Sequence, residues 1–182
     1  KLNGDVVSMV TENLRPERVF YYFEQISNIP RGSGNEKAVS DYCISVAKGL
    51  GLAAFKDEFN NIVIKKPASK GYGNSKGVII QGHLDMVCVK DAGVDFDFEK
   101  DGLNLVVEDG YVHAKGTTLG GDDGIAVAMG LAILEDNTIE HPELEVVFTT
   151  EEEVGMEAAE AAGKAEGEVA ETCKAEVDAQ KA

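Results

Sequence analysis

The sequence predicts an α/β domain in which helices flank a mixed, largely parallel central sheet. Three observations support this class: two stretches near the amino terminus have helical apolar spacing, short apolar runs typical of strands alternate with helical segments, and turn residues separate them. We assign this domain to residues 1–156. Residues 157–182 consist mainly of Ala, Glu and Lys and lack side chains for a core, so this tail is expected to be helical or disordered.

Two helices are expected first. Apolar side chains at positions 19, 20, 23 and 26 have helical spacing, and Pro16 is tolerated in a first helical turn. Residues 29–34 contain Pro, Gly and Ser and interrupt the pattern. A second helix then extends to about Leu50, with Gly51 suited to its carboxyl-terminal cap.

Strands are expected over residues 52–57, 61–65, 77–82 and 144–148. The third has the continuously apolar character of a buried strand. Residues 90–116 suggest acidic hairpins with a turn at residues 108–110. Residues 125–134 suggest a helix that is apolar nearly all round and is therefore buried.

Composition excludes several classes of partner. The chain has 33 acidic and 17 basic side chains and a net charge of −16, which disfavours binding to nucleic acid and to anionic membranes. The 3 cysteines are odd in number and far apart, which indicates a reducing compartment, and we expect a cytoplasmic protein. Cys43 and Cys88 are interpreted as small core hydrophobes.

Imidazole and carboxylate side chains, which can bind a metal or move a proton, occur in three segments that follow apolar runs. In residues 82–86, His83 and Asp85 are two positions apart, so on an extended chain they point to the same side. A metal-bound imidazole commonly donates its other N–H to a carboxylate, so the pair suits a metal ligand and its orienting group. By itself the segment fits a structural histidine equally well.

The second segment, residues 116–124, is rich in glycine and contains Asp122 and Asp123. An ordinary Asp-Asp-Gly turn is the alternative to a site, whereas a phosphate-binding loop is disfavoured because no Lys-Ser/Thr follows the glycines. The third segment has three adjacent carboxylates, at positions 151–153, which need solvent or a cation; a surface acidic run is the alternative.

Taken together, the segments predict a dinuclear metal site. Such a site needs an imidazole, hard carboxylates and a free carboxylate that takes a proton from water. His83, Asp122 and Glu153 are the expected metal ligands, and Glu152 is the expected base.

Three motifs carry a resemblance to a known family: residues 81–87 (QGHLDMV), 116–125 (GTTLGGDDGI) and 150–156 (TEEEVGM). They resemble the signatures of the aminoacyl-histidine dipeptidases (Xaa-His dipeptidases, peptidase D). These belong to the co-catalytic zinc peptidases, together with aminoacylases, tripeptidase T and carnosinases. The resemblance covers residues 13 to 156 and includes residues 60–67.

The resemblance implies a role for each matching residue. His83 would bind one zinc ion, Asp85 would orient its imidazole, and Asp122 would bridge two zinc ions through a segment with a cis peptide bond to Asp123. Glu153 would bind the second zinc ion, and Glu152 would act as general base on a shared water that attacks a dipeptide, with Co²⁺ or Mn²⁺ as possible substitutes for Zn²⁺. Glu151 receives no role.

The chain departs from the family in several respects. Family members are longer and dimerise through a lid domain, which we expect to be absent here. They also have two further ligands, a carboxylate downstream of the Glu pair and a carboxyl-terminal histidine. No histidine follows His141; Asp178 has a suitable position for the carboxylate but no apolar strand before it. His113 and His141 are interpreted as structural or solvent-facing. We therefore expect a truncated catalytic domain with weak or no activity.

Two other readings remain open. The chain could be a metal- or peptide-binding α/β fragment of the same family without turnover, or an α/β domain whose acidic motifs bind nothing. Substitution of Glu152 by Gln distinguishes an enzyme from a protein that only binds, because it should abolish hydrolysis and leave binding nearly intact. Metal analysis of the purified protein distinguishes both of these from a domain that binds no metal.

Overall fold

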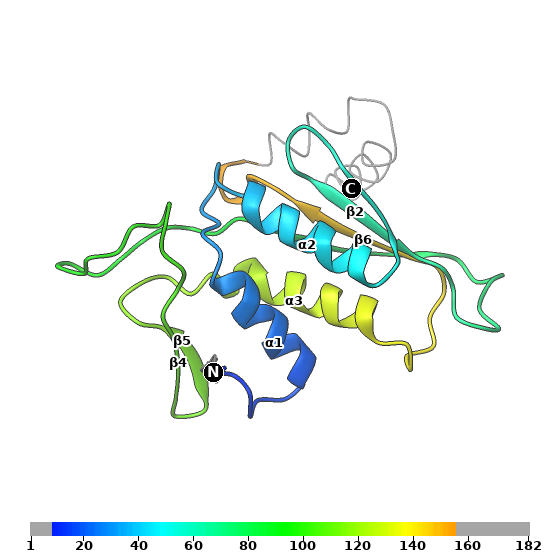
Figure 1. Ribbon diagram of the computed structural model, residues 1–182, viewed down its shortest axis with the longest axis horizontal. Helices are drawn as coiled ribbons and strands as arrows, with labels where there is room; N and C mark the ends of the chain where they lie inside the picture. Colours follow the sequence, from blue (N-terminus) through cyan, green and yellow to red (C-terminus); the bar gives the residue numbers. More distant parts are fainter. Residues whose placement is uncertain (1–8, 156–182) are drawn as a thin grey trace, which may run out of the picture.

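The computed structural model describes residues 9–155, so the expected tail, Cys173 and Asp178 lie outside the described residues (Figure 1). Three α-helices are described: α1 (Glu17–Ser27), α2 (Lys37–Gly49) and α3 (Gly121–Glu135). Six strands accompany them: β1 (Ala53–Lys56), β2 (Ile62–Lys66), β3 (Val78–His83), β4 (Leu105–Glu108), β5 (Tyr111–Ala114) and β6 (Leu144–Thr149). A short 3₁₀ helix, η1 (Glu152–Val154), follows β6. The predicted helices near residues 16–26, 35–50 and 125–134 and the four predicted strands of the main sheet are confirmed.

The main sheet is mixed, with strand order β1-β2-β6-β3. Strand β2 pairs antiparallel with both β1 and β6, whereas β3 runs parallel to β6. The mixed α/β class is therefore confirmed, but within residues 9–155 the parallel part is confined to one of the pairings. The two parallel strands end at the same edge of the sheet, where His83 is level with Thr149.

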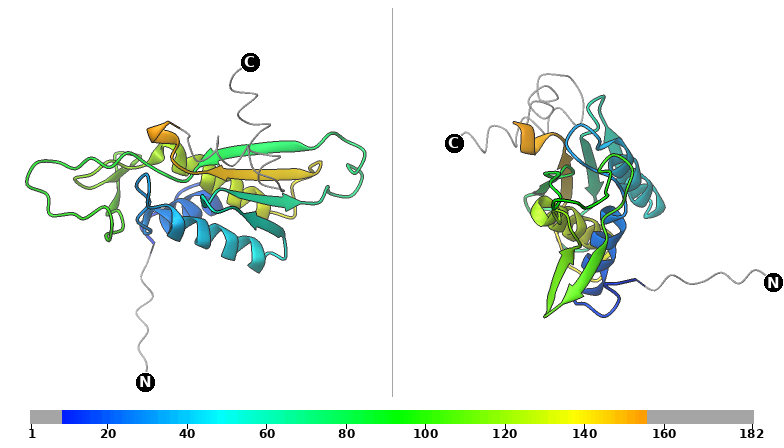
Figure 2. Two further views of the ribbon diagram at one scale, coloured as in Figure 1. Left: turned by 90° about the horizontal axis from the view of Figure 1, so that it is seen from above. Right: turned by 90° about the vertical axis from the view of Figure 1, so that its left-hand side faces the viewer.

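The core lies between the main sheet and the helices, which Figure 2 shows together on one side of it. Side chains alternate along a strand, so Ile62 and Ile64 of β2 face the helices while Val63 faces the other way. Helix α3 lies against β3 and α1, and fully buried Val127 and Leu131 face this core. These contacts fix the start of α3 beside the end of β3.

Three expectations need correction. Helix α3 is not buried all round, because Ile125 and Met129 are 38% and 48% exposed. Cys88 is exposed, whereas Cys43 is buried in the core as predicted. Of the expected acidic hairpins, only the β4–β5 hairpin with its turn after Glu108 forms. Residues 91–104 contain turns and no strand. Phe96, Phe98 and Leu103 of this segment nevertheless pack in or against the core.

No helix among residues 9–155 combines the length and the apolar character needed to cross a membrane.

Candidate metal centre

The candidate site lies where β3 and β6 end. His83 is the last residue of β3 and is only 5% exposed, and η1, with Glu152 and Glu153, begins shortly after β6. Asp122 belongs to the first turn of α3. The site is thus assembled from three segments that are distant in sequence and are joined by the parallel pairing of β3 with β6 and the packing of α3 on β3.

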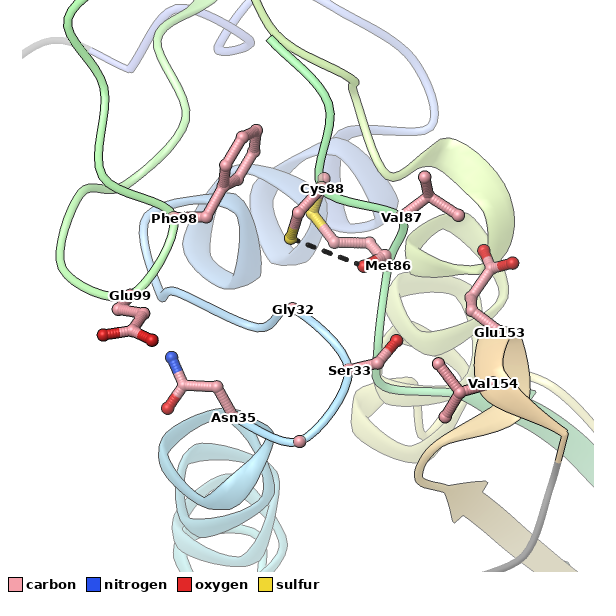
Figure 3. Close-up of a pocket in the computed structure, with 11 residues that line it drawn as sticks. Gly32, Ser33, Asn35, Met86, Val87, Cys88, Phe98, Glu99, Glu153 and Val154 are labelled. Atoms are coloured by element: carbon pink, nitrogen blue, oxygen red, sulfur yellow. Dashed lines mark hydrogen bonds between the residues drawn. The ribbon is translucent and has the colours of Figure 1, made fainter.

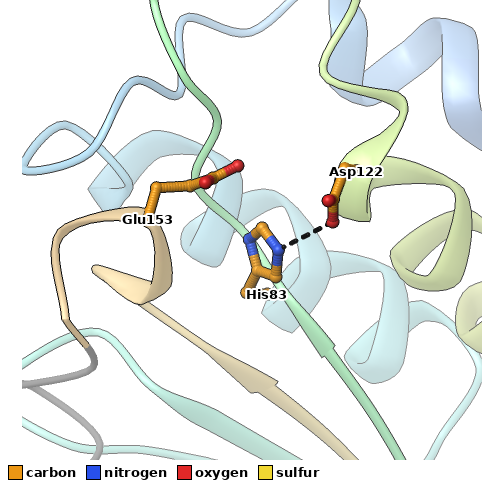
Figure 4. Close-up of side chains that lie close together, drawn as sticks. All are labelled: His83, Asp122 and Glu153. Atoms are coloured by element: carbon orange, nitrogen blue, oxygen red, sulfur yellow. Dashed lines mark hydrogen bonds and ion pairs between the residues drawn. The ribbon is translucent and has the colours of Figure 1, made fainter.

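Ligand atoms of the three predicted metal ligands converge. His83, Asp122 and Glu153 each offer one ligand atom, and these atoms all lie within 4.8 Å of one another (Figure 4). His83 Nε2 is 3.2 Å from Asp122 Oδ1 and 3.7 Å from Glu152 Oε2. One imidazole and two carboxylates at this spacing are a chemically suitable donor set for zinc or a similar divalent ion.

Asp85 holds two parts of this centre in place. One of its carboxylate oxygens, Oδ1, is 3.2 Å from His83 Nδ1, so Nε2 is left to face Asp122. The same fully buried carboxylate accepts hydrogen bonds from the backbone N–H groups of Glu152 and Glu153, each at 3.1 Å. Asp85 therefore orients the imidazole and also fixes the turn that carries Glu152 and Glu153.

The ionisable side chains of the candidate centre shift one another's pKa values. Burial would lower the pKa of His83, but the hydrogen bond and charge of Asp85 outweigh it and raise the pKa to about 9. Burial would raise the pKa of Asp85, but hydrogen bonds from His83, Ser33 and the two backbone N–H groups hold it at about 2. Burial also raises the pKa of Glu153, with His83 opposing and the neighbouring carboxylates adding to the rise. A bound cation would relieve the repulsion among these carboxylates.

The glycine-rich segment shapes the entry to α3. Gly120 has φ of 62°, a left-handed conformation that glycine adopts readily. Asp122 and Asp123 have non-helical backbone angles, and the peptide bond between them is cis, as the family resemblance implies. The Asp122 side chain is 87% exposed and reaches toward the imidazole from the side opposite Glu153.

Two polar residues that the sequence did not single out support the site. The Ser33 hydroxyl donates to Asp85 Oδ2 at 2.7 Å. Glu36, which is 4% exposed, accepts hydrogen bonds from the backbone N–H of Gly34 and of Glu151, each at 3.1 Å. Both lie in or next to a segment that reads as a loop, and no spacing in the sequence marks their distant partners.

A cavity of about 530 Å³ adjoins the candidate ligands (Figure 3). Glu153 belongs to both the ligand group and the cavity lining. Apolar walls come from Met86, Val87, Phe98 and Val154. The cavity has room for a side chain of a small peptide next to the site.

The remaining histidines are placed as expected. His113, on β5, is exposed. His141 is buried at 7% exposure, and its Nδ1 is 2.7 Å from the carbonyl oxygen of Pro142, so it has a structural role.

Comparisons with known proteins agree with this geometry. The chain is 40% identical over 146 residues to the cytosol non-specific dipeptidase of Escherichia coli (strain K12), which covers 80% of this chain and 30% of that protein. The chain thus spans about a third or less of the curated relative that it matches.

The chain is also similar to solved structures of peptidases. The crystal structure of aminoacylhistidine dipeptidase from Vibrio alginolyticus is 39% identical, with a TM-score of 0.80, and the match covers 84% of this chain and 31% of that one. A tripeptidase from Staphylococcus aureus shares the fold at 23% identity, with a TM-score of 0.63 over 84% of this chain and 40% of its own. Residues 79–180 match the sequence profile of the peptidase family M20/M25/M40, and this range contains every residue of the candidate metal centre. The chain therefore belongs to the peptidase family M20/M25/M40.

Proposed function

We propose that this chain forms part of the catalytic domain of a zinc-dependent dipeptidase that hydrolyses short peptides, Xaa-His dipeptides among them. The observation that carries the proposal is the convergence of ligand atoms from His83, Asp122 and Glu153 within 4.8 Å of one another. The names of the Escherichia coli and Vibrio alginolyticus relatives support a dipeptide as substrate. The name of the former, a cytosol dipeptidase, supports a cytoplasmic location.

His83, Asp122 and Glu153 are the residues that would hold zinc. Zinc would supply Lewis-acid polarisation of the scissile carbonyl and make a water molecule more acidic. Co²⁺ or Mn²⁺ would serve similarly, because their ligand preferences overlap with those of zinc.

Glu152 is suited to move the proton. Its carboxylate lies 3.7 Å from His83 Nε2, beside the ligand group, and Asp85 fixes its backbone. As general base it would accept a proton from the attacking water while the new C–O bond forms at the peptide carbonyl. It would then give that proton to the leaving amine as the C–N bond breaks.

Two features bear on the substrate. The apolar cavity beside Glu153 would receive a side chain of the dipeptide next to the scissile bond.

The net charge of −16 disfavours nucleic acid and anionic membranes as partners. In the family that the motifs resemble, dimerisation uses a lid domain; we propose no such contact for residues 9–155.

A non-catalytic metal-binding role is the second candidate, and the number of ligands favours it. Three side chains among residues 9–155 suffice for one zinc ion completed by water, but a second ion would have fewer protein ligands. We therefore expect residues 9–155 to bind one ion more tightly than a second.

Zinc titration of the chelator-treated protein by calorimetry, followed by a hydrolysis assay with Ala-His, tests the proposal. The His83→Ala variant is the control for binding at this site. Zinc binding that His83→Ala removes, together with zinc-dependent release of free histidine, supports the dipeptidase. Binding without release supports the second candidate. Equal zinc binding by the variant contradicts both.

A further inference from the structure

We propose that Arg31 is a positioning residue of the metal centre: its buried guanidinium ties the end of β3 to the start of α3, and so sets how far apart His83 and Asp122 stand. This inference rests on the proposed metal-dependent function and adds a residue outside the ligand set. Arg31 lies in the connection between α1 and α2, more than 50 positions before His83.

The Arg31 side chain is enclosed and points its donors at two separate segments. It is 2% exposed, although arginine is rarely buried to this extent. Its Nη1 donates to the carbonyl oxygens of Leu84 at 3.0 Å and Asp85 at 3.2 Å, directly after His83. Its Nη2 donates to the carbonyl oxygen of Gly120 at 2.5 Å, two residues before Asp122. One rigid, planar group thus bridges the two segments that carry these ligands.

Two glycines of the motif leave room for this guanidinium. A Cβ added at Gly120 would lie 2.5 Å from Arg31 Nη2, and one added at Gly124 would lie at the same distance. Any other residue at either position would displace the arginine. The glycine pattern around Asp122 and Asp123 is therefore matched to Arg31 as well as to the backbone turn.

The positive charge of Arg31 also suits a positioning role. Burial lowers the pKa of Arg31 to about 10, while the charge of Asp85 opposes the fall, so the guanidinium remains protonated at neutral pH. Burying a charged group costs free energy unless it has polar partners. Here Nη1 and Nη2 are paired with backbone carbonyls next to the proposed metal ligands, while Nε has no hydrogen-bond partner among the described residues.

The neighbouring polar groups act on the same segments. Ser33 donates to Asp85, and Glu36 accepts from the backbone N–H of Glu151. With Arg31, this connection contacts the end of β3, the start of α3 and the residues after β6. Arg31 is distinct among them because it alone of these three joins the His83 segment to the Asp122 segment.

A matched control exists in Lys66. It is also a buried cation, at 5% exposure, and its Nζ donates to the carbonyl oxygens of Ile133 and Asp136 at the opposite end of α3. Arg31→Met and Lys66→Met each remove a buried cation that binds carbonyl groups. Both should lower the unfolding temperature, so the two variants separate a stability effect from a positioning effect.

Zinc affinity is the deciding measurement. Calorimetric titration of the full chain, at a temperature where circular dichroism shows each variant folded, should give Arg31→Met a zinc affinity weaker by about 10- to 100-fold, the range seen when groups that orient metal ligands are removed. Lys66→Met should match the wild type. Unchanged affinity in Arg31→Met, or an equal loss in Lys66→Met, overturns the inference.

A second variant and a metal-free measurement guard against ambiguous results. If Arg31→Met does not fold, Arg31→Lys replaces it; this variant keeps the charge but loses the planar fork, and the same affinity loss is expected. The imidazole ¹⁵N shifts of His83 in metal-free protein should change in the Arg31 variant and not in Lys66→Met. If the wild type binds no zinc, the proposed function fails, while unchanged ¹⁵N shifts in the Arg31 variant would overturn this inference separately.

Discussion

The carboxylate of Asp85 accepts a hydrogen bond from the backbone N–H of Glu153 at 3.1 Å, across 68 positions of sequence. The same carboxylate lies 3.2 Å from the imidazole Nδ1 of His83. One side chain therefore aligns two proposed ligands that come from different elements, β3 and η1. Its substitution should disturb both together.

Asp85→Asn is expected to weaken zinc binding by about 10- to 100-fold, as for other groups that orient metal ligands. The amide keeps the size of the carboxylate but presents an NH₂ group to a partner that is itself a donor. Zinc calorimetry on the metal-free protein measures the change. Glu24→Gln is the matched control, because Glu24 also accepts hydrogen bonds from two backbone N–H groups, those of Val10 and Thr11.

Both variants should be less stable than the wild type. An Asp85→Asn protein that binds zinc as tightly as Glu24→Gln would show that Asp85 does not align the ligands.

Two of the three segments of the candidate site, those of His83 and of Glu152 and Glu153, could be found from the sequence because they lie at or after the ends of apolar strands, whereas Asp122 lies in the first turn of α3. Strand β6 ends just before the Glu pair and β3 ends at His83, so apolar runs marked both positions. Parallel strands deliver their carboxyl ends to one edge, which brings distant motifs together. The position of Glu153 near His83 agrees with this argument, whereas Asp122 reaches His83 through the packing of α3 on β3.

Other features carry no local signal. Arg31 reads as one polar residue in a loop, and its partners Leu84 and Gly120 lie 53 and 89 positions away. The placement of β2 between β1 and β6 depends on tertiary pairing, which hydrophobic pattern does not specify. The exposed side of α3 was missed for a related reason: an apolar pattern around the whole helix does not show which side other elements cover.

Glu152→Gln should abolish most hydrolysis while zinc affinity stays near that of the wild type. The amide cannot accept a proton from water, and general acid–base groups contribute about 10²- to 10⁴-fold to a rate. Release of histidine from Ala-His at saturating zinc measures this. Glu151→Gln is the control: it makes the same chemical change one residue earlier, and the hydrogen bonds of Glu151 to Glu36 and Val154 use its backbone, which the substitution keeps. Equal losses in the two variants would argue against Glu152 as base.

Gly130→Ala should destabilise the fold by about 1–2 kcal/mol, because the cost of overpacking exceeds the gain in helix propensity. A Cβ at Gly130 would lie 2.9 Å from Cζ of Phe148, which is fully buried, and 3.1 Å from Cγ1 of Val146. Urea unfolding followed by circular dichroism gives the change in free energy.

Gly49→Ala is the comparison for that prediction, since a Cβ at Gly49, the last residue of α2, meets nothing within 4 Å. It should be neutral or slightly stabilising. A Gly130→Ala protein as stable as Gly49→Ala would mean that α3 can move away from β6 at little cost.

Asp41 should titrate at unusually low pH in the folded protein. Hydrogen bonds from Lys37, at 2.6 Å, and from Lys56 lower its pKa from 3.8 to about 2. Because the folded-state pKa is below the unfolded value, the stabilisation by these contacts is present above pH 3.8 and is lost as pH falls toward 2. The gain in stability is small because the carboxylate is exposed to solvent.

Carboxyl ¹³C shifts followed by NMR should show a titration midpoint near 2 for Asp41 in the wild type and a higher midpoint in Lys37→Met. The unfolding temperatures of wild type and Asp41→Asn should converge as the pH is lowered through this range, and a constant difference down to pH 2 would show that Asp41 stabilises the fold by something other than its charge.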